Sequence, residues 1–328
     1  MVPFEANSVF QIANQEEFQN KALQLFRYQA AHNPVYRSFC QYLNTNVSAI
    51  RALENIPFLP IAFFKSKKVV SGSPVTPTRF TSSGTTGTTR STHFVADIEL
   101  YRKSYSTAFS LFYGPPKDYC ILALLPSYLE REGSSLIYMV DDLIAQSRHP
   151  DSGFYLNDLQ ALKRKIRYLE QQQTKTLLLG VSFALMDLAS HFKGQLKHTI
   201  LMETGGMKGR RKEMVRYELH HILKQAFGVA TIHSEYGMTE LLSQAYSSGE
   251  GTFRCPPWMT VVSRDPEDPL SPQLTGKTGG LNIIDLANIH SCAFIATQDL
   301  GKVYPDGTFE VLGRFDHAEI RGCNLMVF

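Results

Sequence analysis

Residues 82–87 read Ser82-Ser83-Gly84-Thr85-Thr86-Gly87 and form the strongest chemical signal in the sequence. Small residues let a backbone approach an anion closely, so free N–H groups and the hydroxyls of this run could surround a chain of phosphates. Arg90 follows three residues later and adds a fixed positive charge. The run lacks the Gly-Lys-Ser/Thr ending of a Walker loop. It therefore predicts a phosphate-binding loop of another kind, with a flexible polar loop as the alternative.

Glu235-Tyr236-Gly237-Met238-Thr239-Glu240 forms a second signal, which we expect to follow a strand at 229–232. An aromatic ring, a hydroxyl and a carboxylate stand here around a glycine. A ring can stack on a purine, a hydroxyl can reach an α-phosphate, and a carboxylate can bind Mg²⁺. An ordinary turn with an exposed glutamate is the alternative.

Asp299 and Arg314 form a third signal, in Gln298-Asp299-Leu300-Gly301 and Gly313-Arg314-Phe315-Asp316. A carboxylate can accept both hydroxyls of a ribose, and a guanidinium can reach a phosphate or ribose oxygen. Two hairpin-end turns joined by a surface ion pair would give the same pattern, and such pairs contribute little to stability.

The elements that must position these motifs alternate between strand and helix up to about residue 240, which implies a parallel sheet with helices on its faces. Asn33-Pro34 predicts a break between two N-terminal helices, and Asp97 and Asn157 are expected helix caps. The expected strands lie at 119–125, 176–180, 199–202 and 229–232. The expected helices of this part lie at 98–112, 134–146, 158–169, 183–192 and 210–227.

After Thr239 the helical periodicity ends and short strands with turns follow. Pro305-Asp306-Gly307 predicts a hairpin between 302–304 and 309–312. We therefore expect an α/β core with N-terminal helices over residues 1–240 and a β-rich subdomain over residues 241–328, which would complete a nucleotide site.

The composition excludes several classes of protein. A chain of 328 residues that is 43% hydrophobic can bury a large core, and a net charge of +3 does not suggest nucleic-acid binding. The five cysteines are widely spaced and form no CxxC pair, which argues against a disulfide framework or a structural zinc site. Apolar runs are too short to span a bilayer and no signal peptide is evident. We expect a soluble, cytoplasmic protein without a membrane span.

The order and spacing of the three signals resemble the adenylate-forming superfamily, over most of the chain. Other segments look more narrowly like the acyl-protein synthetases of bacterial bioluminescence, also called long-chain-fatty-acid–luciferin-component ligases. The phenylacetate-CoA ligases look like a more distant branch. The segments with this narrower resemblance are 125–131 (LPSYLER), 133–136 (GSSL), 202–213 (METGGMKGRRKE) and 321–323 (RGC).

The resemblance implies the large N-terminal domain of adenylate-forming enzymes, with parallel sheets flanked by helices and a C-terminal β-rich subdomain. It implies a ligase that uses ATP and Mg²⁺ to convert a carboxylic acid, expected to be a fatty acid, into acyl-AMP. The acyl group would then pass to a cysteine of the enzyme as a thioester. A reductase for acyl-CoA or acyl-protein, or another acyl acceptor protein, is the implied partner.

The resemblance also implies residue roles at the phosphates and the metal ion. Thr239 would contact the α-phosphate and Glu240 would hold Mg²⁺. Arg90, or another group, would neutralise charge during adenylation, unless the step is slow or a partner helps. The superfamily loop usually ends in Pro-Lys, and arginine and lysine are not equivalent at a phosphate. The residues implied for the β- and γ-phosphates are Ser83, Gly84, Thr85, Thr86 and Gly87.

Other roles concern the adenosine and the acyl group. Gly205 and Gly206 would let the backbone lie against adenine, and Tyr236 would stack on it. Asp299 would bind the ribose hydroxyls, with Arg314 close by. The acyl-carrying cysteine of the family falls on Cys323.

The sequence leaves two further functions open. The chain stops at Phe328, so we expect the small swinging C-terminal domain of most superfamily members, with its catalytic lysine, to be absent. An acyl- or aryl-CoA ligase of the phenylacetate type is one alternative, although that domain usually helps to bind coenzyme A. A degenerate nucleotide-binding module that has lost turnover is the other.

Overall fold

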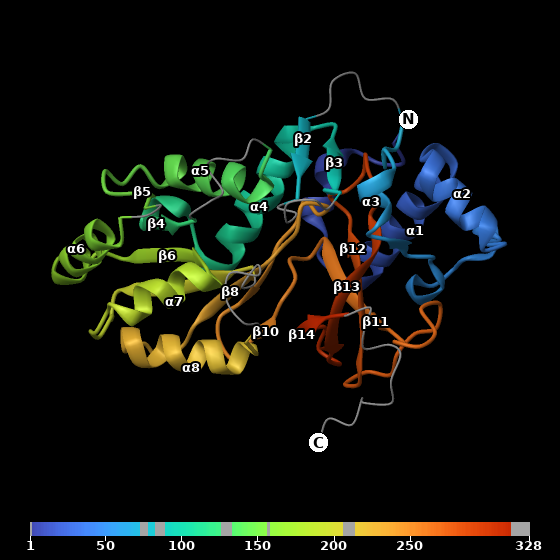
Figure 1. The fold of residues 1–328 in the computed structure, drawn as a ribbon. Coiled ribbons are helices and arrows are strands. Elements are labelled where there is room, and N and C mark those ends of the chain that lie inside the picture. Colours follow the sequence, from blue (N-terminus) through green and yellow to red (C-terminus); the bar gives the residue numbers. More distant parts are fainter. Residues whose placement is uncertain are drawn as a thin grey trace.

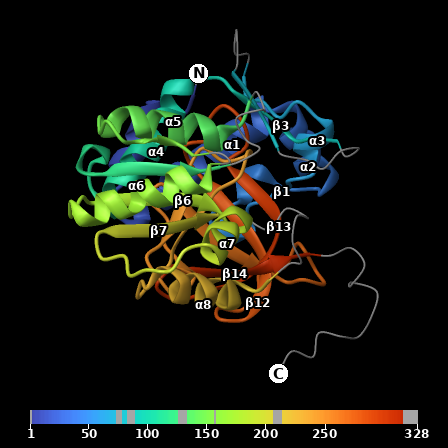
Figure 2. The same cartoon turned by 60° about the vertical axis from the view of Figure 1, so that its left-hand side comes forward.

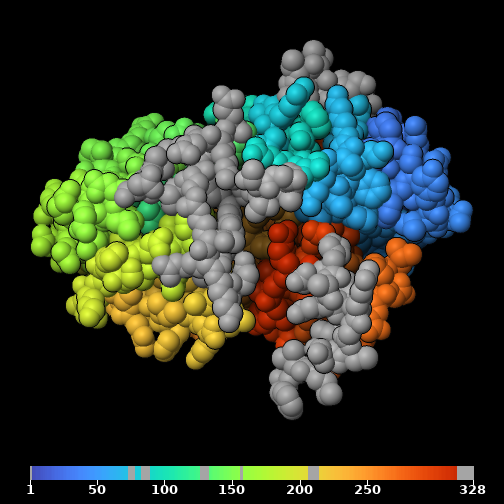
Figure 3. Space-filling model, in the orientation of Figure 1, coloured from blue at the N-terminus to red at the C-terminus, as the bar shows by residue number. Residues whose placement is uncertain are grey.

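The computed structural model describes residues 2–72, 78–82, 89–125, 133–155, 158–205 and 214–315. Two six-stranded sheets, each flanked by helices, lie side by side, and a two-stranded sheet lies at the top between them (Figure 1). The space-filling view shows the corresponding halves of the molecule adjacent to each other (Figure 3). The expected α/β architecture is therefore confirmed.

The first large sheet is the parallel sheet that the strand–helix alternation predicts. Its strand order is β5-β4-β6-β7-β8-β9, parallel except for β9, which pairs antiparallel with β8. β4 and β6 are buried along their whole length, as expected for strands covered on both faces. The strands are β4 (Cys120–Leu124), β5 (Gly153–Phe154), β6 (Thr176–Val181), β7 (Thr199–Thr204), β8 (His233–Tyr236) and β9 (Ala245–Ser247).

Helices cover both faces of this sheet, with α4 and α5 on one face and α7 and α8 on the other (Figures 1 and 2). Asp97 caps α4 as predicted, because its carboxylate accepts from the backbone N–H of Glu99 at 2.9 Å. The helices are α4 (Ile98–Tyr113), α5 (Ser135–Ser147), α6 (Leu159–Gln171), α7 (Ser182–Ser190) and α8 (Arg216–Phe227), and the short helix η4 (Pro116–Asp118) follows α4.

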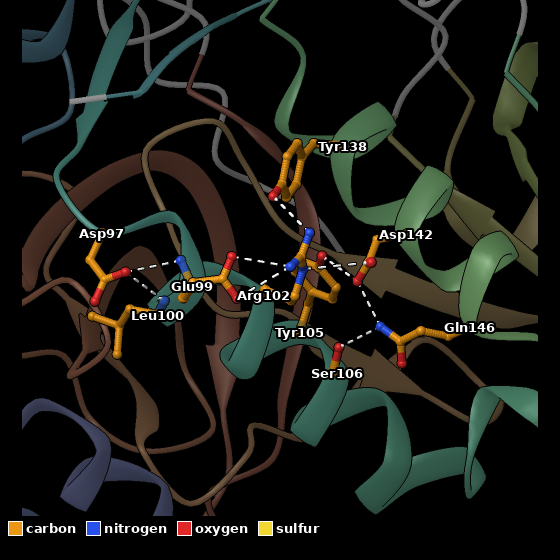
Figure 4. Close-up of polar contacts among 9 residues, drawn as sticks. All are labelled: Asp97, Glu99, Leu100, Arg102, Tyr105, Ser106, Tyr138, Asp142 and Gln146. Atoms are coloured by element: carbon orange, nitrogen blue, oxygen red, sulfur yellow. Dashed lines mark hydrogen bonds and ion pairs between the residues drawn. The ribbon is translucent and has the colours of Figure 1, made fainter. Parts of the chain in front are cut away.

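Polar contacts hold α4 against α5 (Figure 4). Tyr105 of α4 donates to Asp142 of α5 at 2.6 Å, and the guanidinium of Arg102 lies 3.6 Å from the other oxygen of the same carboxylate. Gln146 donates to Ser106 at 3.0 Å and to Asp142 at 2.6 Å. These contacts fix α4 and α5 relative to each other.

Three local expectations differ from the structure. The strand expected at 229–232 begins only at His233, because register with β7 places His233 beside Met202, so Glu235 and Tyr236 lie inside the strand. The helix expected from residue 210 begins at Arg216, after an extended Val215. Asp158 caps α6 by accepting from Ala161 N–H at 2.8 Å, while the expected cap, Asn157, lies outside the described residues.

The second large sheet is mostly antiparallel, with the order β10-β14-β13-β12-β11, and β1 pairs parallel with β13. The predicted hairpin joins β13 to β14, where Gly307 has a positive φ of 79° and Tyr304 N–H donates to Thr308 at 2.8 Å. The strands are β1 (Leu59–Pro60), β10 (Thr252–Phe253), β11 (Met259–Arg264), β12 (Thr278–Asp285), β13 (Phe294–Val303) and β14 (Phe309–Arg314).

The N-terminal helices pack on this second sheet. Asn33 separates them as predicted, since its side chain accepts from the N–H groups of Val35 and Tyr36 while Pro34 opens the second helix. The Phe26 and Phe294 rings meet edge to face at 6.0 Å between centroids. The helices are η1 (Ala6–Gln11), α1 (Gln15–His32), α2 (Pro34–Tyr42), η2 (Val47–Ala49), η3 (Leu53–Asn55) and α3 (Phe63–Ser66).

The small sheet consists of β2 (Thr78–Thr81) and β3 (Thr92–Val95), whose connection contains the Ser/Thr/Gly run. The division of the chain at residue 240 stays a prediction, with β9 still part of the first sheet and the N-terminal helices in contact with the second. Among the described residues no helix combines the length and apolar character needed to cross a bilayer.

Gln29 provides a test of the contact between α1 and the second sheet. Its buried amide donates to the carbonyls of Asn288 and Ile289 at 2.8 and 3.0 Å and accepts from Ala293 N–H at 2.9 Å. Gln29→Leu should lower the free energy of unfolding by about 3 kcal/mol, because each buried group left unpaired costs roughly 1–3 kcal/mol.

Urea unfolding of the two proteins measures this difference. Gln24→Leu, on the exposed face of the same helix, is the matched control and should change stability by no more than about 0.5 kcal/mol. Equal losses in the two variants would contradict the assigned role of Gln29.

Candidate active site

The carboxyl ends of β7 and β8, the middle of β13 and the end of β14 bring the predicted adenosine-binding residues together. The Tyr236 hydroxyl donates to Asp299 Oδ2 at 2.7 Å, and Arg314 Nε lies 3.4 Å from Asp299 Oδ1. Asp299 and Arg314 are direct partners in the β13–β14 ladder. Three residues from three strands thus form one cluster around a nearly buried carboxylate.

The Tyr236 ring is held rigidly within this cluster. Its centroid lies 5.5 Å from that of Phe309 and 5.8 Å from that of Phe253, in edge and tilted contacts. Burial raises the pKa of Tyr236, and the negative charge of Asp299 raises it further, so the hydroxyl stays a donor. Burial also raises the pKa of Asp299, while the hydrogen bond from Tyr236 and the charge of Arg314 lower it.

Gly205 lies at the same level of the sheet as Tyr236, because the preceding residues, Thr204 of β7 and Glu235 of β8, are paired. Gly205 has a positive φ of 69°, which a glycine adopts without strain. The Ser182 hydroxyl donates to the Gly205 carbonyl at 2.6 Å and so fixes the exit of β7.

Thr239 and Glu240 lie in the turn directly after β8. Leu241 N–H donates to the Met238 carbonyl at 3.1 Å and closes this turn. The Glu240 side chain is buried, and burial raises its pKa, opposed by a hydrogen bond from Ser91 and by the charges of Arg314 and Lys65. The carboxylate therefore lies near the cluster and close to the strand that leaves the Ser/Thr/Gly run.

A third carboxylate, that of Asp285, stabilises the segment that follows the turn after β8. Asp285, at the end of β12, accepts from the N–H groups of Leu242 and Ser243 at 2.8 and 3.0 Å and from the Ser243 hydroxyl at 2.6 Å. Trp258 Nε1 donates to the same Ser243 hydroxyl oxygen at 2.9 Å. These contacts join the second sheet to the turn that follows the first.

Two buried glutamates at the ends of β7 and β8 have opposite electrostatic environments. Burial raises the pKa of Glu203, but hydrogen bonding to His220 and the charge of Arg216 outweigh it and leave that pKa below its ordinary value. Glu235 contacts no cation among the described residues that offsets its burial. Burial raises its pKa to about 7, the Thr204 hydrogen bond opposes this shift, and the charge of Glu203 adds to it.

The structure describes seven of the residues singled out from the sequence. Tyr236, Asp299 and Arg314 meet directly. Arg90 is exposed and directly precedes Ser91, the residue that contacts Glu240. The others described are Gly205, Thr239 and Glu240, while Ser83, Gly84, Thr85, Thr86, Gly87, Gly206 and Cys323 lie outside the described residues. Their individual roles stay predictions.

Sequence reasoning missed several residues that shape the site. Asp285, Asn288 and His93 come from segments without a recognisable motif, and each acts on the turn through a contact distant in sequence. Glu235 belongs to the motif at residues 235–240. Its position directly before Tyr236 was the sequence signal that could have identified it as a site residue. Gly237 accommodates it, since a Cβ there would lie 2.5 Å from Glu235 Oε1.

Within the described residues, no group of three or more His, Cys, Asp or Glu side chains could hold a metal ion. A single buried carboxylate such as Glu240 suits Mg²⁺ that arrives with a nucleotide, because Mg²⁺ is commonly bound by one or two carboxylates together with phosphates and water. The residues present therefore fit an Mg²⁺ ion that binds together with a nucleotide.

Comparison with known proteins decides the family. Residues 160–328 match the family described as "Acyl-protein synthetase, LuxE". The chain belongs to this family. It is accordingly a ligase of the acyl-protein synthetase type, and the resemblance inferred from the sequence is confirmed. The long-chain-fatty-acid–luciferin-component ligase of Aliivibrio fischeri is 24% identical over 340 residues, which cover 95% of this chain and 88% of that protein.

Solved structures of adenylate-forming ligases share the fold. The 2-hydroxyisobutyryl-CoA ligase in complex with 2-HIB-AMP and CoA aligns with a TM-score of 0.69 and 12% identity, over 92% of this chain and 70% of that one. ATP-bound MatB from Rhodopseudomonas palustris aligns with a TM-score of 0.55 and 18% identity, over 72% of this chain. The chain spans about half the length of MatB, 47% of that chain.

The buried Glu235 gives a pH-dependent prediction. Its folded-state pKa of about 7 lies above the ordinary 4.5, so the folded chain retains a proton that the unfolded chain loses between these values. The free energy of unfolding should therefore fall as pH rises from about 4.5 to 7, by roughly 3 kcal/mol from this group. Glu235→Gln keeps an acceptor for Thr204 and removes this loss.

Urea unfolding of wild type and Glu235→Gln between pH 5 and pH 8 isolates the contribution, because other titrating groups cancel in the difference. The variant should gain stability relative to wild type as pH rises. Glu218→Gln, on the exposed face of α8, is the control and should track wild type. A pH-independent difference for Glu235→Gln would contradict the raised pKa.

Proposed function

We propose that this chain activates a carboxylic acid, expected to be a fatty acid, with ATP to form an acyl adenylate. The acyl group then moves to a cysteine of the chain as a thioester, for delivery to an acyl acceptor protein such as a reductase. The observation that supports this most directly is the Tyr236–Asp299–Arg314 cluster beside the Thr239–Glu240 turn, in a chain of the acyl-protein synthetase family.

The Asp299 carboxylate suits a ribose. Each of its oxygens has two lone pairs, and the described contacts use Oδ2 for Tyr236 and place Oδ1 near Arg314. Both oxygens keep capacity for a ribose hydroxyl. Arg314, whose side chain is 73% exposed, can reach a phosphate from its place beside Asp299.

Gly205 and Tyr236 suit the base. The backbone at Gly205 has no side chain to exclude a flat ring, and the Tyr236 ring is fixed by Asp299, Phe253 and Phe309. A ring held in place loses little conformational freedom when a purine stacks on it. We assign the neighbouring Gly206 the same role.

The proposed reaction joins one oxygen of the acid to the α-phosphorus of ATP while pyrophosphate leaves. Catalysis of such a step is mainly positioning and neutralisation of charge. Thr239 would donate to an α-phosphate oxygen, and Ser83 to Gly87 would surround the β- and γ-phosphates. Arg90 would offset charge on the leaving group. Mg²⁺ bound at Glu240 would neutralise charge on the phosphates.

Cys323 is the proposed acyl acceptor. Its thiolate would attack the acyl carbonyl of the adenylate and AMP would leave, which forms the thioester. The four described cysteines are poor candidates, because burial raises the pKa of Cys40 and Cys120 to about 11, that of Cys292 to about 12 and that of Cys255 as well. A thiol that stays protonated is a weak nucleophile at neutral pH.

The adenylation step predicts exchange of labelled pyrophosphate into ATP that requires both Mg²⁺ and an acid. Glu240→Gln should lower the exchange rate roughly 100-fold, the loss typical for removal of one charge-stabilising group. A panel of saturated fatty acids and aryl acids identifies the substrate class. Glu267→Gln, in an exposed loop, is the matched control. Binding of ATP without exchange for any acid would favour a degenerate module.

The transfer step predicts a covalent acyl group on Cys323. After incubation with ATP, Mg²⁺ and a labelled acid, wild-type protein should retain label that hydroxylamine releases. Cys323→Ser should lose this label and keep pyrophosphate exchange, while Cys255→Ser should keep both. Label that persists in Cys323→Ser would contradict the assignment, and release of acyl-CoA on addition of coenzyme A would favour a CoA ligase instead.

A further inference from the structure

Ser91 and His93 project from the same side of β3 and its approach, and both are buried. His93 Nδ1 lies 2.8 Å from the Thr239 carbonyl oxygen, and Ser91 opposes the rise in the pKa of the Glu240 carboxyl group. His93 of β3 and Ser91, just before that strand, thus act on two consecutive residues of the turn. These interactions link β3 to the turn at Thr239 and Glu240.

Asn288, in the connection between β12 and β13, holds the same turn. Its side-chain Nδ2 donates to the Glu240 carbonyl at 2.8 Å. The Asn288 backbone is itself fixed, since its N–H donates to the Asp285 carbonyl at 3.0 Å and its carbonyl accepts from Gln29 at 2.8 Å. The carbonyls of Thr239 and Glu240 are therefore held by a side chain of β3 and a side chain of the β12–β13 connection.

The hydrogen-bond roles of His93 and Asn288 follow from these partners. A carbonyl oxygen only accepts, so His93 Nδ1 bears the hydrogen and the neutral ring keeps Nε2 as an acceptor. Asn288 donates through Nδ2, which leaves its Oδ1 as an acceptor. Both remaining acceptors, His93 Nε2 and Asn288 Oδ1, are buried and have no hydrogen-bond partner among the described residues.

Both residues line one small cavity. Its volume is about 10 Å³, close to the least that can hold one water molecule, and other walls come from Asp97, Leu242 and His290. Buried acceptors without a partner are costly. A water molecule has two hydrogens to donate, which matches the two unpartnered acceptors of residues that line this space.

We propose that one buried water bridges His93 Nε2 and Asn288 Oδ1, and that His93 and Asn288 are positioning residues for Thr239 and Glu240. This inference rests on the proposed nucleotide and Mg²⁺ binding at that turn. The water joins the two side chains that hold adjacent carbonyls, so the turn is fixed from both sides at once. Displacement of either side chain moves the turn that carries Thr239 and Glu240.

Binding of ATP, measured by calorimetry with and without Mg²⁺, tests the positioning role apart from turnover. His93→Phe keeps a buried ring and removes both nitrogens, and it should weaken Mg²⁺–ATP binding roughly 10- to 100-fold, as loss of a supporting partner does at metal sites. Binding of ATP in EDTA should weaken less, because only the contact of Thr239 with the α-phosphate is then affected. Asn288→Ala should show the same split.

His93→Asn is the conservative variant, because its amide nitrogen can occupy the place of Nδ1 and donate to Thr239. It should retain most of the Mg²⁺–ATP affinity that His93→Phe loses. Leu162→Ala in α6 is the control for a general loss of stability, since it opens a cavity far from the turn and should leave both affinities unchanged. Equal weakening with and without Mg²⁺ in His93→Phe would overturn the positioning role.

A high-resolution crystal structure of the wild-type chain tests the water. Density for one water within hydrogen-bonding distance of His93 Nε2 and Asn288 Oδ1 is the expected result, and a dry cavity would overturn the bridge. Failure of the proposed function can be distinguished from failure of the positioning role. Wild-type protein that binds Mg²⁺–ATP with the predicted variant pattern, yet exchanges no pyrophosphate with any acid, would leave the positioning role standing and reject the reaction.

Discussion

The buried carboxylate of Asp285 is the interaction on which the site depends most. It accepts two backbone N–H groups and one hydroxyl from Leu242 and Ser243, which lie just beyond the turn that follows β8. Burial of a carboxylate is costly unless such donors surround it, so the contact specifies one arrangement of the two chain segments. Because Asp285 ends β12 of the second sheet, it sets where the first sheet's turn lies.

The rest of the site builds on that arrangement. With the turn fixed, Tyr236 on β8 can reach Asp299 on β13, and Arg314 on β14 pairs with the same carboxylate. The N-terminal helix α1 also supports this arrangement, since Gln29 fixes the backbone of the segment between β12 and β13. Residues distant in sequence thus form one cluster. The first sheet contributes Tyr236, and the second sheet contributes Asp299 and Arg314.

Local chemistry explains how much could be predicted from the sequence. The helix break at Asn33 and the cap at Asp97 depend on neighbouring residues alone, and both predictions are confirmed. The start of β8 depends on register with β7, so the expected strand at 229–232 was wrong. The motif residues were recognisable as a set, but the contact of His93 with Thr239 spans 146 positions and no local pattern indicates it.

A crystal structure of the chain with a stable acyl-adenylate analogue, such as an acyl sulfamoyl adenosine, tests the central claim most directly. The account predicts that the ribose hydroxyls contact Asp299 while Tyr236 keeps its bond to that carboxylate. Adenine should lie between Tyr236 and the backbone at Gly205, and the sulfamoyl group should lie beside Thr239. An analogue bound away from the Tyr236–Asp299–Arg314 cluster, or one that does not bind at all, would contradict it.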